Sequence, residues 1–267
     1  MTAASPAGTV FFLGGTSDAR ELAVQLQSLG YDIRASVTTA SGAESLHEVG
    51  ISTRVGRLTR DQMSGVLKEM GARALVDASH PFAEEAHRTA MDAATQVGIP
   101  YIRYERRALD YSEHPGILLV DSYEEAADLA AQIKGSIMLT TGAKTLALFA
   151  ERLIGDPDIR LVIRMLPRAD NLQHAEALGF SQKNIVGMQG PFSRELNQAL
   201  YRHFGTTVVI TKESGDVGSV AEKVETALEM GIQVIVINRP TIAYQNACTT
   251  IDRVVDALRE HMPGGVM

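Results

Sequence analysis

The sequence of 267 residues predicts an α/β protein made of two tandem Rossmann-like domains, each with a doubly wound parallel sheet. Short β-branched and apolar runs alternate almost without interruption with stretches of helical periodicity, which is typical of parallel α/β folds. The chain is also longer than the roughly 100–150 residues at which domains cluster. A polar loop near residues 110–116 interrupts the alternation and predicts the boundary.

Residues 1–114 are expected to form the N-terminal domain. Glycines such as Gly30, Gly71 and Gly98 follow its helical stretches, where a left-handed cap suits glycine. The predicted strands are Thr9–Leu13, Asp32–Thr38, Ser52–Val55, Ala74–Asp77 and Tyr101–Tyr104. The predicted helices are Ala19–Leu29, Arg60–Met70 and Glu84–Val97.

Residues 115–267 are expected to form the C-terminal domain by the same pattern. Its predicted strands are Ile117–Val120, Ser136–Thr140, Arg160–Arg164, Asn184–Met188, Thr207–Thr211 and Gln233–Asn238. Its predicted helices are Tyr123–Ile133, Lys144–Leu153, Arg194–His203, Ser219–Met230 and Ile251–His261. Two such domains are expected to leave an interdomain cleft, and ligands are expected beyond the carboxyl ends of the strands.

Composition excludes several classes of protein. The chain is 45% hydrophobic, yet no apolar run approaches the ~20 residues that cross a bilayer, and the first eight residues lack a signal-peptide pattern. We therefore expect a cytoplasmic protein with no membrane partner. A net charge of −7 argues against a nucleic-acid surface. Cys248 is the only cysteine, and no histidine spacing suits a metal, so we expect no metal site.

The first predicted strand ends in a glycine turn that opens a helix. Gly14 and Gly15 precede Thr16 and Ser17, which are residue types that cap helices, and Arg20 follows one turn on. A strand that feeds a helix through glycines directs backbone N–H groups and the helix dipole at one spot, which suits a phosphate. The third glycine of the dinucleotide fingerprint is absent, so a purely structural turn stays open.

The second predicted strand ends in hydroxyl groups where NAD-binding domains usually place an acidic residue. Ser36, Thr38 and Thr39 lie there, and Arg34 and Arg57 are close along the chain. A carboxylate repels a 2′-phosphate, whereas hydroxyls and an arginine accept one, so the pattern favours NADPH over NADH. A solvated loop rich in Ser and Thr is the alternative.

His80 lies in a loop after the fourth predicted strand, between Ser79 and Pro81. With Asp77 three residues earlier, it could serve as an acid, a base or a hydrogen-bond donor. A structural histidine is the alternative interpretation. The other histidines considered, His47, His87, His174 and His203, have no partner pattern and are expected at the surface.

Four cations follow separate predicted strands of the second half. They are Lys144, Arg164, Lys212 and Arg239. Because parallel strands end at one edge of a sheet, these side chains are expected to share one face and to bind a polyanion. Ordinary surface charge would explain one or two of them.

Several of these segments resemble one family, the NADPH-dependent precorrin-6A reductases of cobalamin biosynthesis. The segments are residues 13–20, 76–83, 98–106, 139–144, 189–193, 211–215 and 237–240. Residues 76–83, Val-Asp-Ala-Ser-His-Pro-Phe-Ala, are similar to a signature of that family. The resemblance covers nearly the whole chain, with a departure at residues 216–219, where a second glycine pair would be expected.

The resemblance implies that NADPH donates a hydride to one double bond of a tetrapyrrole that carries many carboxylates, and that the product passes to the next pathway enzyme. The positions of the residues along the chain divide the site, with the cofactor expected on the loops of the first domain: Gly14, Gly15, Thr16, Ser17, Arg20, Ser36, Thr38, Thr39, Arg57, Ser79, His80 and Pro81. The substrate-binding residues would be Arg103, Arg106, Lys144, Arg164, Ser193, Lys212, Ser214 and Arg239. Hydride transfer is expected to need mainly positioning, and the expected catalytic residues are His80 and Lys212, of which either one could donate the proton.

Two other classes stay open at this stage. A non-catalytic two-domain sensor that closes on a small anion would also have a cleft, but it predicts no affinity for NADPH. A short-chain or nucleotide-sugar oxidoreductase would normally show Tyr-x-x-x-Lys, and no tyrosine in this chain has a lysine four residues later.

Overall fold

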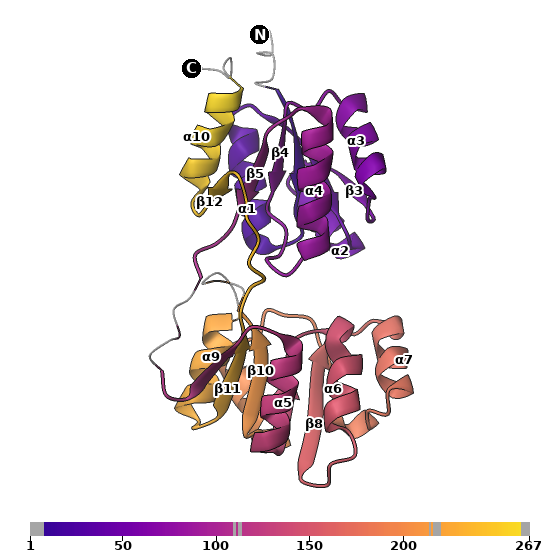
Figure 1. Cartoon of the computed structure of the whole chain (residues 1–267), viewed down its shortest axis with the longest axis vertical. Coiled ribbons are helices and arrows are strands. Elements are labelled where there is room, and N and C mark those ends of the chain that lie inside the picture. The colour runs from indigo at the N-terminus through magenta and orange to yellow at the C-terminus, as the bar shows by residue number, and fades with distance from the viewer. Residues whose placement is uncertain (1–7, 109–110, 112–113, 214, 216–219, 263–267) are drawn as a thin grey trace. The chain divides into compact units, whose positions relative to one another are not determined.

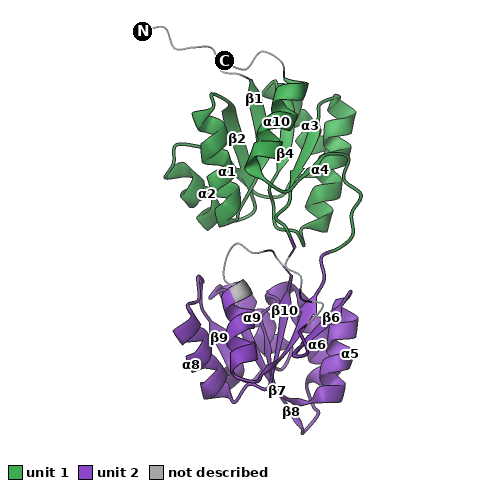
Figure 2. Cartoon of the chain, turned by 90° about the vertical axis from the view of Figure 1, so that its left-hand side faces the viewer, with its two compact units in different colours: residues 1–107, 240–267 green, residues 108–239 purple. Residues whose placement is uncertain are grey.

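The computed structural model describes residues 8–108, 111, 114–213, 215 and 220–262, and the chain divides into two compact units. Unit 1 comprises residues 1–107 and 240–267, and unit 2 comprises residues 108–239 (Figure 2). Each unit contains a six-stranded parallel sheet with helices packed around it (Figure 1). The predicted fold class, two parallel α/β domains, is therefore confirmed.

Unit 1 contains strands β1 to β5 and β12, with helices α1 to α4 and α10. In chain order they are β1 (Thr9–Leu13), α1 (Ser17–Ser28), β2 (Asp32–Val37), α2 (Ala40–His47), β3 (Ser52–Val55), α3 (Arg60–Glu69), β4 (Ala74–Asp77), α4 (Glu84–Val97), β5 (Tyr101–Tyr104), β12 (Ala247–Cys248) and α10 (Ile251–His261). The sheet order is β12-β5-β4-β1-β2-β3, so β1 lies in the middle. Its carboxyl end, which carries the glycine turn, is therefore central to one edge of the sheet.

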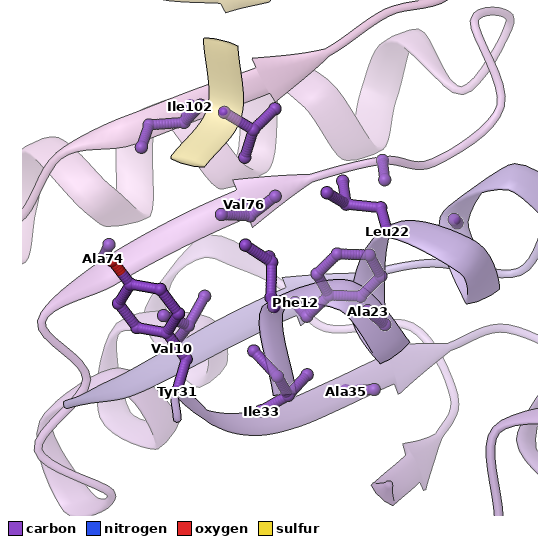
Figure 3. Close-up of a cluster of buried hydrophobic side chains, with 14 of the residues drawn as sticks. Val10, Phe12, Leu22, Ala23, Tyr31, Ile33, Ala35, Ala74, Val76 and Ile102 are labelled. Carbon is purple, nitrogen blue, oxygen red and sulfur yellow. The ribbon is translucent and has the colours of Figure 1, made fainter. Parts of the chain in front are cut away.

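Alternation along β1 gives the sheet two buried faces. Phe12 packs with side chains of α1, α2 and α10, as in the cluster that Figure 3 shows around Val10 and Phe12. Phe11 points to the opposite face, where α3 and α4 contribute Leu67 and Ala90. Burial of both faces explains why this strand is apolar from Val10 to Leu13 and why it is rigid enough to position a turn.

Unit 2 contains strands β6 to β11, helices α5 to α9 and two short 3₁₀ helices. In chain order they are β6 (Ile117–Val120), α5 (Tyr123–Ile133), β7 (Gly135–Leu139), η1 (Ala143–Thr145), α6 (Leu146–Leu153), β8 (Ile159–Met165), α7 (Ala169–Ala177), η2 (Gln182–Asn184), β9 (Ile185–Gly187), α8 (Arg194–Phe204), β10 (Val208–Lys212), α9 (Val220–Glu229) and β11 (Gln233–Ile237). The sheet order is β6-β11-β10-β7-β8-β9. Tyr201 and Phe204 of α8 and Val224 of α9 cover one face.

The two sheets share one strand order, and each takes its sixth strand from the other half of the chain. Read from β3, unit 1 runs β3-β2-β1-β4-β5 before β12, and unit 2 runs β9-β8-β7-β10-β11 before β6. The first five places follow the Rossmann order. β6 directly follows β5 in sequence but pairs with β11, whereas β12 follows β11 but pairs with β5.

This exchange corrects the expected C-terminal domain, residues 115–267. Residues 240–267 belong to unit 1, because β12 pairs with β5 and the apolar side of α10 lies in the core around Phe12. The pairing of β12 involves only Ala247 and Cys248, which is too short for a strand pattern to reveal. The other boundary, after residue 107, is close to the expected one.

Two helices, α2 and α7, were not among the predicted elements. α2 begins within Ala40-Ser41-Gly42, whose composition is typical of a loop, but Thr39 caps it by accepting a hydrogen bond from the Gly42 amide. Within the described part of the chain, no helix combines the length and the apolar character needed to cross a bilayer.

Candidate active site

The turn between β1 and α1 leaves backbone and one hydroxyl available to a ligand. A Cβ on Gly14 would lie 3.0 Å from Phe12 Cε1, and Gly15 has φ of +132°, so both positions favour glycine. A Cβ on Gly15 would meet no atom within 4 Å. Thr16 precedes α1, and its Oγ1 is buried with no hydrogen-bond partner among the described residues. Open backbone and an unpaired hydroxyl at a helix start fit a phosphate.

An ion pair neutralises the carboxylate nearest this turn. Asp18 lies in the first turn of α1, and Arg106, which follows β5, binds both of its oxygens, with Nε 2.5 Å from Oδ2. Without Arg106, this carboxylate would repel a phosphate at the same helix start. Arg106 is thus committed to Asp18 rather than displayed as the expected substrate cation. Arg20 points toward α2, where its Nε donates to the Ser45 carbonyl (2.9 Å).

The hydroxyl-rich end of β2 lies beside the glycine turn. A Cβ on Gly42, in the first turn of α2, would be 3.7 Å from Cα of Gly15. Thr39 is engaged in capping α2, whereas Thr38 is exposed. The structure therefore brings together the two segments that the sequence separately linked to a dinucleotide.

An arginine that sequence reasoning did not select lies at this edge. Arg54 of β3 donates from Nη1 to the buried Ser36 Oγ (3.3 Å) and to the Gly56 carbonyl (3.4 Å). Arg57, the expected phosphate ligand, is exposed, with its Nη1 3.8 Å from Glu85 Oε2. Arg54 could have been selected from its position opposite Ser36 in the parallel pair of β2 and β3. That position is known only once the pairing of the strands is known.

The end of β4 holds a fully buried carboxylate with four side-chain partners, and we call Asp77, Ser79, His87, Tyr101 and Arg103 the Asp77 cluster. Oδ2 accepts from the Tyr101 hydroxyl (2.8 Å) and lies 2.7 Å from His87 Nδ1. Oδ1 accepts from Ser79 Oγ (2.6 Å) and from Arg103 Nη1 (3.3 Å). Burial raises the pKa of Asp77, but these partners outweigh it and hold that pKa well below its usual range.

Two expectations are wrong for this cluster. Arg103 is fully buried and so is not exposed to a substrate. Its Nη1 also donates to the carbonyls of Asp77 (3.0 Å) and Ser79 (2.9 Å). Its guanidinium carbon lies 5.6 Å from the centre of the Tyr244 ring. His87 was expected at the surface, yet it too is fully buried. A carboxylate on a neighbouring strand explains both, because it stabilises buried cationic or hydrogen-bonding groups.

The Asp77 cluster fixes the loop that carries His80. Its members bind the backbone of this loop at Ser79 and at the Pro81 carbonyl, which lies 3.3 Å from His87 Nε2. His80 is half-buried, and its Nδ1 accepts from the Phe82 amide (3.2 Å), so the neutral ring carries its proton on Nε2. The loop therefore holds His80 on a rigid support.

In unit 2, the end of β8 carries a buried arginine with neutral partners. Arg164 Nη1 donates to Asn197 Oδ1 (2.7 Å), and its guanidinium carbon lies 4.0 Å from the Phe192 ring centre. Only 7% of Arg164 is exposed, and this burial lowers the pKa of its guanidinium. An amide and an aromatic ring orient the cation without neutralising it.

Lys212, at the end of β10, is another cation at this edge. Burial and repulsion from Lys144 lower the pKa of Lys212 to about 8, whereas Lys144 itself is exposed. The structure thus brings Lys144 and Lys212 into electrostatic contact, as their positions after β7 and β10 predicted.

The other residues that were expected to bind substrate either have partners within the protein or lie outside the described residues. Arg239 forms an ion pair with the buried Glu213, whose Oε1 accepts from Nη2 at 3.2 Å. Ser193 is exposed and caps α8 by accepting from the Leu196 amide (3.3 Å). Ser214 and the departure at residues 216–219 lie outside the described residues.

Sequence reasoning missed one buried cation, Lys223 of α9, which is 5% exposed. Its helical position looks like a solvated face, and only the packing of α9 reveals its burial. Among the described residues, no group of three or more histidine, cysteine or acidic side chains is placed to hold a metal ion.

The strand orders and the glycine turn place the chain in the class of tandem Rossmann-like α/β proteins. Residues 9–259 match the family model described as precorrin-6x reductase CbiJ/CobK. The chain belongs to this family, whose members are oxidoreductases. The resemblance that the motifs indicated is thereby confirmed, and the non-catalytic anion sensor loses its support.

Curated relatives cover most of the chain. The cobalt-precorrin-6A reductase of Priestia megaterium is 50% identical over 249 residues, which are 93% of this chain and 97% of that protein. The cobalt-precorrin-6A reductase of Salmonella typhimurium is 38% identical over 88% of each chain. A solved structure, CobK precorrin-6A reductase, has a TM-score of 0.80 and 23% identity, and the match covers 97% of this chain and all of that one. The last comparison supports the fold.

Proposed function

We propose that this protein reduces one double bond of a precorrin-6A macrocycle in cobalamin biosynthesis, with a reduced nicotinamide dinucleotide as hydride donor. The family match over residues 9–259 carries this proposal. The names of the relatives at 50% and 38% identity favour a macrocycle that carries cobalt. We also propose that the enzyme is cytoplasmic, because the dinucleotide is regenerated in the cytoplasm and the product can pass there to the next pathway enzyme.

An anaerobic assay with the cobalt-bearing and metal-free macrocycles tests this proposal. We expect oxidation of the dinucleotide and a product heavier by one hydride and one proton. The cobalt form should give the higher kcat/KM. Absence of turnover with both forms would contradict the proposal, and preference for the metal-free form would contradict only the assignment of cobalt.

Unit 1 is proposed to bind the dinucleotide. When bound, this cofactor supplies the hydride. Gly14, Gly15 and Thr16 would hold its pyrophosphate through backbone amides and the unpaired Thr16 hydroxyl. Thr38 and Arg54 would contact its adenosine ribose, and the loop of His80 would border the nicotinamide end.

NADPH is proposed as the preferred donor, because the end of β2 offers hydroxyls and Arg54 rather than a carboxylate. A charge-assisted contact to the 2′-phosphate contributes about 1.5–3 kcal/mol, so Arg54→Ala should raise KM for NADPH by roughly 10- to 100-fold and leave KM for NADH unchanged. Steady-state kinetics with both donors would measure this. Arg60→Ala, at an exposed ion pair of α3, is the control. Equal use of NADH by the wild type would overturn this specificity.

Unit 2 is proposed to bind carboxylates of the macrocycle. Arg164 is a buried cation and Lys212 a half-buried one at the same edge of its sheet, and Lys144 adds an exposed one. Carboxylates would offset the repulsion that lowers the pKa of Lys212. Each charge-assisted hydrogen bond would also orient the macrocycle, because guanidinium and ammonium donors have defined directions.

Lys212 is also proposed, with His80, as a donor of the proton that completes the reduction. If protonated Lys212 donates, the single-turnover rate should fall as pH rises through about 8. Removal of Lys144 relieves the repulsion, so Lys144→Met should move this decline to higher pH. Lys212→Met should lower the rate by about 10²–10⁴-fold and remove the decline. An unchanged rate in Lys212→Met or in His80→Ala would exclude that residue as the donor.

A further inference from the structure

We propose that Lys223 and Arg164 form a buried oxyanion-binding subsite in unit 2, in which Lys223 joins the strand-end Arg164 in holding one carboxylate of the macrocycle. This inference rests on the proposed function and adds to it a residue that no motif indicated. Its basis is the placement of two buried cations whose described surroundings contain no carboxylate partner.

Lys223 lies on α9 with 5% of its surface exposed. The Tyr201 hydroxyl donates to its backbone carbonyl (3.2 Å), which fixes this turn of the helix against α8. Its ammonium makes no hydrogen bond or ion pair with the residues that the structure describes. Lysines this deeply buried are normally paired, because an ammonium loses its hydration without compensation.

The partner cation, Arg164, is oriented but not neutralised. Its contacts are with the Asn197 amide oxygen and the ring of Phe192, and neither carries a charge. A guanidinium has five N–H donors, so most of them are left for another acceptor. A carboxylate accepts two parallel hydrogen bonds from such a group.

Helix α8 places these groups close to each other, because Asn197 and Tyr201, one turn apart on it, bind Arg164 Nη1 (2.7 Å) and the Lys223 carbonyl (3.2 Å). Burial lowers the pKa of Lys223 well below its usual range, and the positive charges of Arg164 and Lys212 lower that pKa further. Arg164 and Lys223 thus approach neighbouring turns of α8, and the charge of Lys212 reaches Lys223. A fold that buries like charges together is favoured when an anion binds among them.

A second polar group on the same helix supports the assignment. Thr226 follows Lys223 by three residues, so both lie on one face of α9. It is 1% exposed, and its Oγ1 has no hydrogen-bond partner among the described residues. A face of α9 with an unpaired hydroxyl and an unpaired ammonium is unsuited to a purely apolar core and suits an oxygen-rich group.

The test uses the full-length enzyme and the variant Lys223→Met, which keeps the length of the side chain without its charge. The macrocycle probe is a porphyrin octacarboxylate, titrated by absorbance without dinucleotide, and NADPH is titrated separately. We expect the dissociation constant of the porphyrin to rise at least tenfold and that of NADPH to stay unchanged. Thermal unfolding should occur at the same or a higher temperature, because a buried amine without a hydrogen-bond partner among the described residues is replaced by an apolar side chain.

Lys183→Met, at an exposed position of η2, is the matched control and should change none of these values. Unchanged porphyrin affinity in Lys223→Met would overturn the proposal and leave Lys223 a structural residue. A rise in the NADPH constant instead would overturn it in favour of a phosphate site. If Lys223→Met fails to fold, Arg164→Gln tests the same subsite from β8. Reductase activity of the wild type is measured in parallel, so that failure of the subsite and failure of the proposed function are distinguishable.

Discussion

Replacement of Asp77 by Ala is expected to lower the free energy of unfolding of unit 1 by about 3–5 kcal/mol. The carboxylate is the shared partner of Arg103 and His87, which are both fully buried. Its removal leaves a buried guanidinium with two neutral carbonyls and one more distant carboxylate, Glu105, whose Oε1 lies 3.5 Å from Nη2. Denaturant unfolding, followed by circular dichroism and analysed for each unit, measures the change. A loss below about 1 kcal/mol would contradict the central role of Asp77.

Asp170→Ala is the matched control. Asp170 also accepts two hydrogen bonds from an arginine, Arg168, but both side chains are exposed. An exposed pair contributes at most about 1 kcal/mol, because water and salt screen it. The contrast between the two aspartates therefore separates the effect of burial from the effect of pairing.

The same carboxylate makes stability depend on pH in a defined direction. The pKa of Asp77 is lowered in the folded protein, whereas an unfolded aspartate has a pKa of about 3.9. Its contribution is therefore fully present above about pH 5 and is lost progressively as pH falls toward the folded-state pKa. Asp77→Asn should remove this part of the acid dependence. Parallel acid profiles for the variant and the wild type would contradict the assignment.

Most of the fold follows from local pattern, and the exceptions have a common physical cause. Short apolar runs were sufficient to predict β1 and β4, because both strands are buried on two faces. β12 escaped prediction because its two residues gain their strand character only from pairing with β5. The membership of α10 in unit 1 was hidden for the same reason, since an amphipathic helix specifies a buried face but not the sheet that covers it.

The candidate site was predictable in its location and less so in its individual side chains. Strand ends located the glycine turn and the cations of unit 2, because parallel topology brings such ends to one edge. The roles of Arg103 and Arg106 depended on acidic partners far away in sequence, at Asp77 and Asp18. A cation followed by a loop looks the same in sequence whether it binds a ligand or a buried carboxylate. Tertiary packing decides between them.

Substitution of Gly15 by Val is expected to weaken NADPH binding by about 100-fold, which corresponds to roughly 2.7 kcal/mol. A valine disfavours φ of +132°, and its side chain would occupy the open space above the turn, where the pyrophosphate is proposed to bind. The affinity for a porphyrin octacarboxylate should stay unchanged, because its proposed ligands belong to unit 2. Isothermal titration with each ligand measures both constants.

Gly30→Val separates strain from ligand contact. Gly30 also has a positive φ, +88°, and an added Cβ there would likewise meet no atom within 4 Å, but it follows α1 at the opposite end of that helix from the glycine turn. Both variants should lose stability to a similar extent, since the cost arises from the backbone conformation. Only Gly15→Val should lose NADPH. If both variants lose NADPH binding equally, the glycine turn affects the cofactor through folding alone. If neither variant loses it, the dinucleotide binds elsewhere and the proposed roles of the two units must be revised.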